Sequence, residues 1–212
     1  MDSGSRQPQQ ARSRRTMERL LAATITVIEE KGLSGITIPE IAAAAGVSTG
    51  SIYRRFVDKD ALVRAALLQM LETFHEANRA NIPPDRFKGR SLEEAVHALC
   101  RALVAQYRGR TRLMKALDQF VELQGDNGFR ERVVNLSEAS LRLIIHALLP
   151  FKDRIAATDP ERAITFALLS AVTLIEVHKL HESPLWKHML PLDDDALAEE
   201  TARTMAAYLG SQ

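Results

Sequence analysis

Apolar residues recur through most of this chain at the three- and four-residue spacing of an α-helix, and glycine or proline interrupts each run. The pattern predicts an all-α fold of about nine helices and no strand. Two short helices are expected after Thr37 and Ser48, and the other expected ranges are about 13–31, 59–78, 91–108, 112–123, 129–149, 160–181 and 193–209. Residues 182–192, which hold two prolines and the only tryptophan, are expected to form a connection.

The stretch from Thr37 to Leu62 has start signals for two short helices close together. Thr37 with Glu40 forms a capping box, Ser48 can cap a second helix, and Gly46 lies in the turn between them. Six apolar positions give the two helices a common buried face: Ile41, Ala42, Ala45, Val47, Ile52 and Phe56. This arrangement predicts a helix-turn-helix, whose second helix fits the major groove of DNA.

Charge is distributed unevenly along the chain, although the formal net charge is only +1. Residues 1–64 carry ten Lys or Arg against seven Asp or Glu, which leaves +3, and the remainder carries eighteen against twenty, which leaves −2. A basic N-terminal part on a slightly acidic body suits a protein that places one end on phosphate.

Composition supports a folded protein in a reducing compartment. Apolar residues make up 46% of the chain, enough for a buried core. The single cysteine, Cys100, cannot form an intramolecular disulfide, and no signal peptide pattern precedes the first helix, so a cytoplasmic location is expected. The apolar run Ala163 to Ile175, which no other uncharged run of the chain exceeds in length, is shorter than the ~20 residues that span a bilayer and predicts a buried or subunit-interface helix.

The sequence G-V-S-T-G-S-I-Y-R-R-F-V-D-K-D-A-L, residues 46–62, resembles the DNA-binding signature of the TetR family of bacterial transcriptional regulators. The resemblance covers roughly residues 13–64, and the rest of the chain is similar only in helical pattern and length. It implies a three-helix helix-turn-helix DNA-binding domain at 13–64 and an effector-binding and dimerisation domain at 65–212. Residues 1–12 are polar and are expected to be a disordered tail, whose arginines either contact DNA or remain solvated.

Residues expected to contact DNA lie at the start of the second helix and just beyond it. Small residues there allow close backbone approach, Arg54 can bond O6 and N7 of guanine together, and Arg55 can bind a base or a phosphate. The resemblance implies that Thr37, Tyr53 and Lys59 contact the DNA backbone; the alternatives are that Thr37 is only a cap, Tyr53 only packs and Lys59 is only solvated. The full expected set is Thr37, Ser48, Thr49, Gly50, Ser51, Tyr53, Arg54, Arg55 and Lys59.

One departure from the family pattern bears on the operator. Many members carry Tyr-x-His-Phe or Tyr-x-Tyr-Phe where this chain has Tyr53-Arg54-Arg55-Phe56. Paired arginines favour guanine, so the hypothesis is a guanine-rich operator at the contacted positions.

The C-terminal region is expected to dimerise and to hold a ligand. Apolar stripes on the last two helices predict a four-helix dimer interface, with a place in the protein's own core as the alternative. Its expected residues are Leu168, Ala171, Val172, Ile175, Ala202, Met205 and Leu209. A pocket for a small apolar or aromatic effector is expected from residues that combine apolar bulk with a few polar tips, each of which could equally be plain core: Phe74, Cys100, Leu103, Tyr107, Phe120, Leu123 and His146.

The pattern therefore predicts a homodimeric repressor that a small effector releases from a palindromic operator. The alternative is an architectural or constitutive DNA-binding protein without an effector. Nucleophile-elbow, phosphate-loop, dinucleotide and C-x-x-C motifs are all lacking, so neither catalysis nor a cofactor is expected. The spacing of His178, His181 and Glu182 makes a metal site conceivable, with a solvated or interface helix end as the alternative, so no metal is expected. The sequence leaves open the effector, the operator and whether the output is repression or activation.

Overall fold

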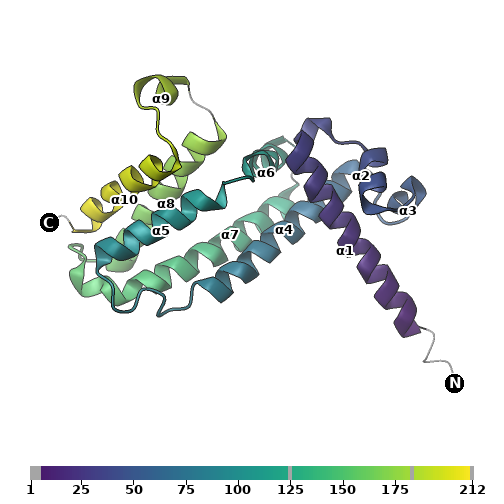
Figure 1. Ribbon diagram of the computed structural model, residues 1–212. Helices are drawn as coiled ribbons and strands as arrows, with labels where there is room; N and C mark the ends of the chain where they lie inside the picture. Colours follow the sequence, from purple (N-terminus) through teal and green to yellow (C-terminus); the bar gives the residue numbers. More distant parts are fainter. Residues whose placement is uncertain (1–5, 124–125, 182–183, 211–212) are drawn as a thin grey trace. The chain divides into compact units, whose positions relative to one another are not determined.

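The computed structural model describes residues 6–123, 126–181 and 184–210, and every regular element among them is helical (Figure 1). The α-helices are α1 (Arg6–Lys31), α2 (Ile38–Ala45), α3 (Thr49–Tyr53), α4 (Lys59–Asn81), α5 (Leu92–Gln106), α6 (Thr111–Leu123), α7 (Asn127–Leu148), α8 (Pro160–Leu180), α9 (Pro184–Met189) and α10 (Asp194–Gly210). Two 3-10 helices, η1 (Leu33–Gly35) and η2 (Leu149–Arg154), complete them. The all-α prediction is confirmed.

The chain forms two compact units. The head unit comprises 6–73 and 112–134, and the body unit comprises 74–111 and 135–210 within the described residues. The helices α4 and α7 each contribute to both units.

The head unit is built around one face of α1. Leu20, Val27 and Ile28 are buried there, and the Thr24 hydroxyl, also buried, donates to the Leu20 carbonyl oxygen at 2.8 Å. Further buried residues come from the neighbouring elements of the unit: Ile36, Ile38, Ile41, Ala42, Ala45, Ile52, Leu62, Val63, Ala66, Leu67, Met70, Leu113, Ala116, Phe120 and Phe129. Burial of this apolar surface is the main source of the stability of the unit.

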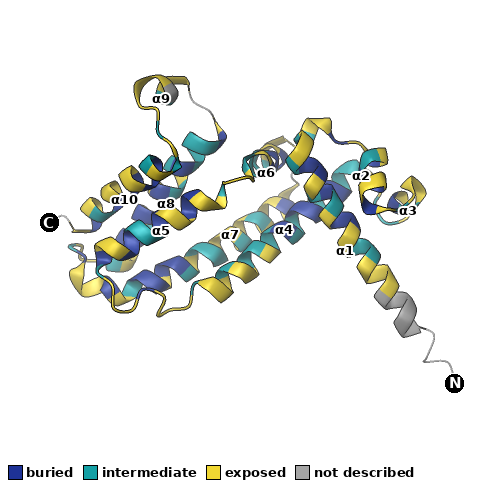
Figure 2. Cartoon of the chain, viewed as in Figure 1, coloured by how far each residue is buried: buried dark blue, intermediate teal, exposed yellow. Residues whose placement is uncertain are grey.

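The body unit has its own core between α5, the second half of α7, η2, α8 and α10. Figure 2 shows buried positions along α5, α8 and α10 and yellow, exposed positions on their outer sides. Ser91 and Glu94 cap α5 reciprocally, and Asp159 caps α8 just before Pro160, as the sequence predicts. The Ala156 amide donates to the Leu209 carbonyl oxygen at 3.0 Å, which joins the segment after η2 to the end of α10.

Three local predictions differ from the structure. The first helix, α1, begins at Arg6 and not near Ser13, because glutamine, alanine and arginine are good helix formers and Pro8 falls in the first turn, where proline is tolerated. The predicted connection at 182–192 contains α9, which starts at Pro184 for the same reason. The second helix of the motif ends at Tyr53, so Arg54 and Arg55 lie at and beyond its end.

Two segments, Asn127–Arg154 and Pro160–Leu180, are long and apolar enough by length and composition to cross a membrane. The expectation from the thirteen-residue uncharged run understated this property, because few charges interrupt α8. Core helices of soluble proteins pass the same test, and Ile164, Leu168 and Ile175 of α8 are completely buried in the body core. The same helix also carries apolar side chains that remain exposed, Phe166 and Leu169.

Two adjacent candidates for the effector pocket differ sharply in burial and provide a stability test. Phe120 is fully buried and meets the Phe129 ring edge-on at 5.2 Å, whereas Leu123 is 78% exposed. Phe120→Ala should lower the free energy of unfolding by about 3–5 kcal/mol, because it removes buried apolar surface and leaves a cavity, and Leu123→Ala should change it by less than about 0.5 kcal/mol. Denaturant unfolding of both variants checks this; equal effects would contradict the packing described.

Candidate nucleic-acid interface

Side-chain caps start both α2 and α3, and a glycine ends α2 at the turn between them. Thr37 accepts a hydrogen bond from the Glu40 amide, while Glu40 accepts from the Thr37 amide at 3.1 Å, which completes the predicted capping box. Gly46 ends α2 in the left-handed conformation, with φ of 63°, which glycine adopts without strain. The Ser48 hydroxyl accepts from the Ser51 amide at 3.2 Å and starts α3.

The apolar face predicted for the helix-turn-helix is confirmed. Ile41, Ala42, Ala45 and Ile52 are buried, and Val47 and Phe56 are half-buried. The opposite side of α3 therefore faces solvent, with Thr49, Gly50 and Tyr53 exposed.

Ser51 organises the polar side of α3. Its hydroxyl lies 2.9 Å from the Ser48 hydroxyl and accepts from Arg54 Nη2 at 2.9 Å. Its carbonyl oxygen accepts from Arg55 Nη1 at 3.2 Å. Both arginines are therefore folded back toward α3, Arg54 exposed and Arg55 half-buried.

A basic groove lies between the N-terminal part of α1 and the helix-turn-helix. It has a volume of about 980 Å³ and is lined by Arg12, Ser13, Arg15, Thr16, Arg19, Gly46, Val47, Ser51, Arg54 and Arg55. The Arg55 Nη2 group donates to the Ser13 hydroxyl at 3.5 Å, which links the two sides. Five guanidinium groups thus line one groove, and no acidic residue does.

The sequence raises DNA contact for the arginines of residues 1–12, which include Arg12, but it does not single out Arg15 and Arg19 as site residues. Arg12, Arg15 and Arg19 follow one another at spacings of three and four, so they lie on one face of a helix. That spacing was a usable signal, but it has meaning only if the helix extends back to Arg12, and residues 1–12 were expected to be disordered.

The capping box limits what Thr37 can do. The Thr37 hydroxyl donates to Glu40 Oε2 at 2.8 Å, and Glu40 also accepts from Lys31. The hydrogen bond from Lys31 and then that from Thr37 lower the pKa of Glu40, so its carboxylate stays ionised at neutral pH and keeps the box closed. In this geometry the hydroxyl has no free proton for a phosphate, which favours the interpretation of Thr37 as a cap.

Lys59 is half-buried at the first position of α4. Asp58 precedes it and accepts from the Ala61 amide at 2.7 Å, as a helix cap. The Lys59 side chain therefore lies at the capped start of α4, in the head unit.

The seven residues expected to line an effector pocket are divided between the two units, and Cys100, Leu103 and Tyr107 lie in or against the body core. Phe120 and Leu123 belong to the head unit and the other five to the body unit, because the selection relied on residue type and not on packing. In the body, Cys100 and Leu103 are buried in the core, and burial raises the pKa of the Cys100 thiol to about 12. This thiol is therefore protonated and unreactive at neutral pH.

The remaining three pocket candidates are less buried. The Tyr107 hydroxyl donates to Glu176 Oε1 at 3.3 Å, and the Arg110 guanidinium carbon lies 4.9 Å from the centre of the Phe74 ring. His146 is exposed, with Nδ1 2.7 Å from the Arg142 carbonyl oxygen. The basic groove, and the body-unit cavities beside Phe87 and between α8 and α10, are lined by other residues.

Most of the residues expected at a dimer interface are buried inside the subunit. Leu168, Ala171, Ile175, Ala202, Met205 and Leu209 belong to the body core, and only Val172 is half-buried. This placement favours the alternative that the stripe packs in the subunit's own core, because a helical apolar stripe does not by itself show which neighbour covers it. Ala171 and Met205 also line a groove between α8 and α10. The exposed apolar side chains of the same two helices are Phe166, Leu169 and Tyr208.

The conceivable metal site lies partly outside the described residues, since Glu182 falls there. His178 stands edge-on to Trp186 of α9, with ring centres 6.2 Å apart. Among the residues that the structure describes, no group of three or more potential metal ligands comes together.

Capped helices around a left-handed turn, with a polar and basic outer side, define a helix-turn-helix. Residues 20–66 match the family model for bacterial regulatory proteins of the tetR family. The HTH-type transcriptional regulator BetI of Stenotrophomonas maltophilia is 42% identical over 60 residues, which are 28% of this chain and 31% of that protein. Residues 20–66 therefore have the helix-turn-helix sequence of the TetR family.

Solved structures extend the likeness to the whole fold. A putative TetR-family regulator from Mesorhizobium loti has a TM-score of 0.68 at 18% identity, over 93% of this chain and 96% of that one. FadR from Bacillus subtilis, solved in complex with stearoyl-CoA, has a TM-score of 0.58 at 16% identity, over 92% and 99%. The sequence match spans about a third of BetI, so only the fold of the C-terminal region follows from these comparisons. Regulators of this family are not enzymes, as the sequence predicts.

Proposed function

We propose that this protein is a homodimeric repressor, which binds a palindromic operator through α3 and the basic groove and is released by a small apolar or aromatic effector. The observation that carries the DNA-binding part is the groove itself. Five arginines line it beside the exposed start of α3, and no acid there opposes phosphate. Phosphate contacts supply most of the affinity of such interfaces, and contacts to base edges supply the specificity.

The arginines after α3 are suited to base recognition. Arg54 is held by a neutral hydroxyl, that of Ser51, and this bond is readily exchanged for one to a base. A guanidinium that bonds O6 and N7 of guanine discriminates by about 1–3 kcal/mol. Arg55 donates hydrogen bonds to both Ser51 and Ser13, so it links α3 to α1. It is therefore better suited than Arg54 to binding a phosphate.

The arginines of α1 form the other side of the proposed DNA contact. Arg12, Arg15 and Arg19 are exposed and line the same groove as Arg54. A phosphate in the groove would meet positive charge from both sides, which positions the protein on the duplex without reading its sequence.

An exposed apolar patch supports dimerisation. Phe166 and Leu169 of α8 and Tyr208 of α10 are 59%, 48% and 46% exposed, and the rings of Phe166 and Tyr208 lie 5.4 Å apart. Phe166 and Tyr208 line an apolar groove of about 200 Å³ between α8 and α10. Its lining also includes Ser170 and Thr204, which are small enough for close helix approach. This patch accounts for the exposed apolar surface of α8, and its burial against a second copy would pair two heads for two half-sites.

The body unit supports the effector part of the proposal by its apolar core. In the same fold, FadR from Bacillus subtilis was solved with stearoyl-CoA, a ligand with a long apolar chain. An effector that prefers the conformation with unfavourable head spacing lowers operator affinity by the ratio of its affinities for the two conformations.

Replacing Arg54 tests base recognition. Arg54→Ala should reduce discrimination at one guanine of each half-site by about five- to 150-fold, as expected from ~1–3 kcal/mol. Arg54→Lys is the matched control for charge: it should retain phosphate affinity but lose the same preference, because an ammonium cannot bond both guanine atoms in one plane. In a binding-site selection, an unchanged consensus for either variant would exclude this role.

Neutralising the α1 arginines tests the groove. Arg15→Gln and Arg19→Gln should each lower the slope of log K against log salt by about 0.9 for every phosphate that the variant no longer neutralises. Arg14→Gln removes the same charge from the same helix at a position that does not line the groove, and should leave the slope unchanged. Fluorescence anisotropy at several salt concentrations measures the slopes, and equal slopes for all three variants would contradict the proposed DNA-binding role of the groove.

Placing charge in the apolar patch tests dimerisation. Phe166→Glu should convert the dimer to monomer in sedimentation velocity and weaken operator binding, because a buried carboxylate without a partner is costly. Val134→Glu, at a side chain that is 61% exposed on α7, is the control and should leave the dimer intact. Should Phe166→Glu remain dimeric with unaltered operator affinity, the two copies must meet elsewhere.

Titration with stearoyl-CoA and a panel of aromatic compounds separates a regulated repressor from a constitutive binder. An effector should raise the operator Kd about five- to 150-fold, the range of ordinary allosteric coupling. If every compound leaves the Kd unchanged and the footprint lacks a palindrome, the constitutive or architectural alternative is the better description.

A further inference from the structure

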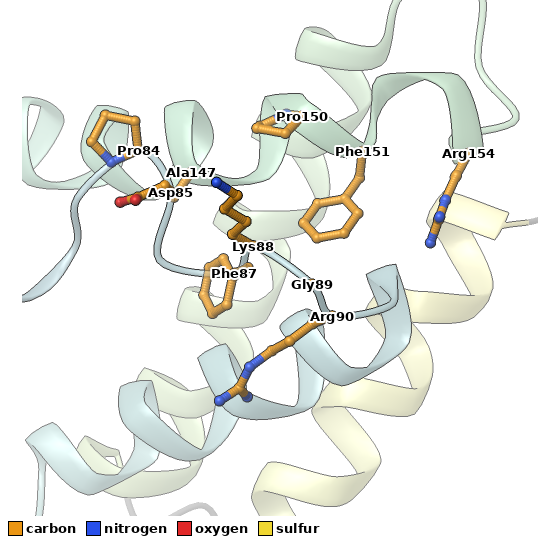
Figure 3. A pocket seen from close by; sticks show the side chains of 10 residues that line it. All are labelled: Pro84, Asp85, Phe87, Lys88, Gly89, Arg90, Ala147, Pro150, Phe151 and Arg154. Carbon is orange, nitrogen blue, oxygen red and sulfur yellow. The ribbon is translucent and has the colours of Figure 1, made fainter.

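A second cavity in the body unit lies away from the residues expected to bind the effector. It has a volume of about 520 Å³, within the range of small-molecule sites. The segment between α4 and α5 forms one side, and the end of α7 with η2 forms the other (Figure 3). Its lining residues are Pro84, Asp85, Phe87, Lys88, Gly89, Arg90, Ala147, Pro150, Phe151 and Arg154.

Two aromatic rings supply the apolar part of this cavity. Phe87 and Phe151 are only 4% and 8% exposed, although both lie outside the α-helices. In Figure 3 their rings lie on either side of the Lys88 side chain in this view. An aromatic ligand could pack against these rings in offset or edge-on geometry, worth about 0.5–1.5 kcal/mol per pair beyond its buried area.

Hydrogen bonds fix the backbone that lines the cavity before any ligand binds. The Lys88 amide donates to the Asp85 carbonyl oxygen at 2.9 Å, and the Arg90 amide donates to that of Phe87 at 3.1 Å. Gly89 has φ of 80°, which lets the chain turn into the cap of α5. Pro84 and Pro150 restrict the two opposing segments further. A preformed site of this kind loses little conformational entropy on binding.

Positive charge dominates the rim. Lys88, Arg90 and Arg154 face a single acid, Asp85. Arg90 is directed along α5 (Figure 3), where its charge acts on Glu94, whose pKa is lowered mainly by hydrogen bonds from the amide and hydroxyl of Ser91 and to a lesser extent by Arg90. Within the described part of the chain, neither Lys88 nor Arg154 forms an ion pair.

We propose that this cavity binds a small aromatic carboxylate, with its ring against Phe87 and Phe151 and its carboxylate paired with Lys88. Arg154, at the far end of the cavity in Figure 3, adds positive potential and a place for a second anionic group. The site shares no residue with the predicted effector pocket or with the DNA-binding groove, so it does not depend on the proposed repressor function.

The cavity also adjoins a structural junction. Pro150 and Phe151 belong to η2, which connects α7 to α8. The backbone just after η2 is hydrogen-bonded to the end of α10. A ligand that fills the cavity would therefore contact the connection into the helix that carries the proposed dimer patch.

The pair 2-naphthoate and 2-naphthamide tests the proposal, because the two probes match in ring and shape but differ in charge. Isothermal titration calorimetry of the full chain should show tighter binding of naphthoate. Lys88→Gln should weaken naphthoate binding about three- to tenfold and leave naphthamide nearly unchanged, while Arg154→Gln should have a smaller effect. Lys152→Gln, a neighbouring charge that does not line the cavity, is the matched control and should bind both probes as the unmodified protein does.

Chemical-shift mapping on the unmodified protein locates the site independently of any variant. Naphthoate should shift the amide signals of Lys88, Gly89 and Phe151. The proposal is overturned if naphthoate does not bind, if naphthamide binds equally well, or if the shifted signals lie elsewhere in the chain. It is also overturned if Lys88→Gln and Lys152→Gln behave alike.

Discussion

The short helix α3 depends on its neighbours for its existence, and the DNA-binding surface depends on α3. Five residues cannot form a stable helix alone in water, because nucleating a helix costs more free energy than one turn of hydrogen bonds returns. The missing stabilisation comes from the burial of Ile52 against α2, the Ser48 cap and the left-handed turn at Gly46. The apolar contacts therefore set the direction of the exposed polar side of the helix.

Polar contacts in the head unit fix the positions of its helices more than they contribute to its stability. Arg112 donates to the Glu30 carbonyl oxygen at the end of α1, and Arg64 and Asp126 form an ion pair at 2.7 Å between α4 and the segment before α7. Exposed pairs of this type contribute about 0–1 kcal/mol each. Their value is positional, since they attach α6 and the start of α7 to the same unit as the helix-turn-helix.

In the body unit, α8 has two apolar faces. One face, which includes Ile164, Leu168 and Ile175, is completely buried in the core, and the other presents Phe166 and Leu169 to solvent. A helix with apolar residues on both sides resembles a membrane span by composition, yet the burial pattern is that of a core helix with one uncovered face. The dimer proposal follows from this second face, not from the stripe that periodicity alone selects.

The sequence by itself determined the all-helical class, the caps of α2, α3, α5 and α8, and the helix-turn-helix with its buried face, because each depends on residues within about ten positions of one another. Local hydrogen bonds and helical spacing are enough for such features. Only the tertiary structure decided that Arg12, Arg15 and Arg19 share a groove with Arg54, that the predicted dimer stripe is core, and that Phe120 and Cys100 belong to different units. These outcomes depend on which surfaces meet after folding, and an apolar or charged stripe has the same local pattern whether its neighbour is the chain itself, a second copy or DNA.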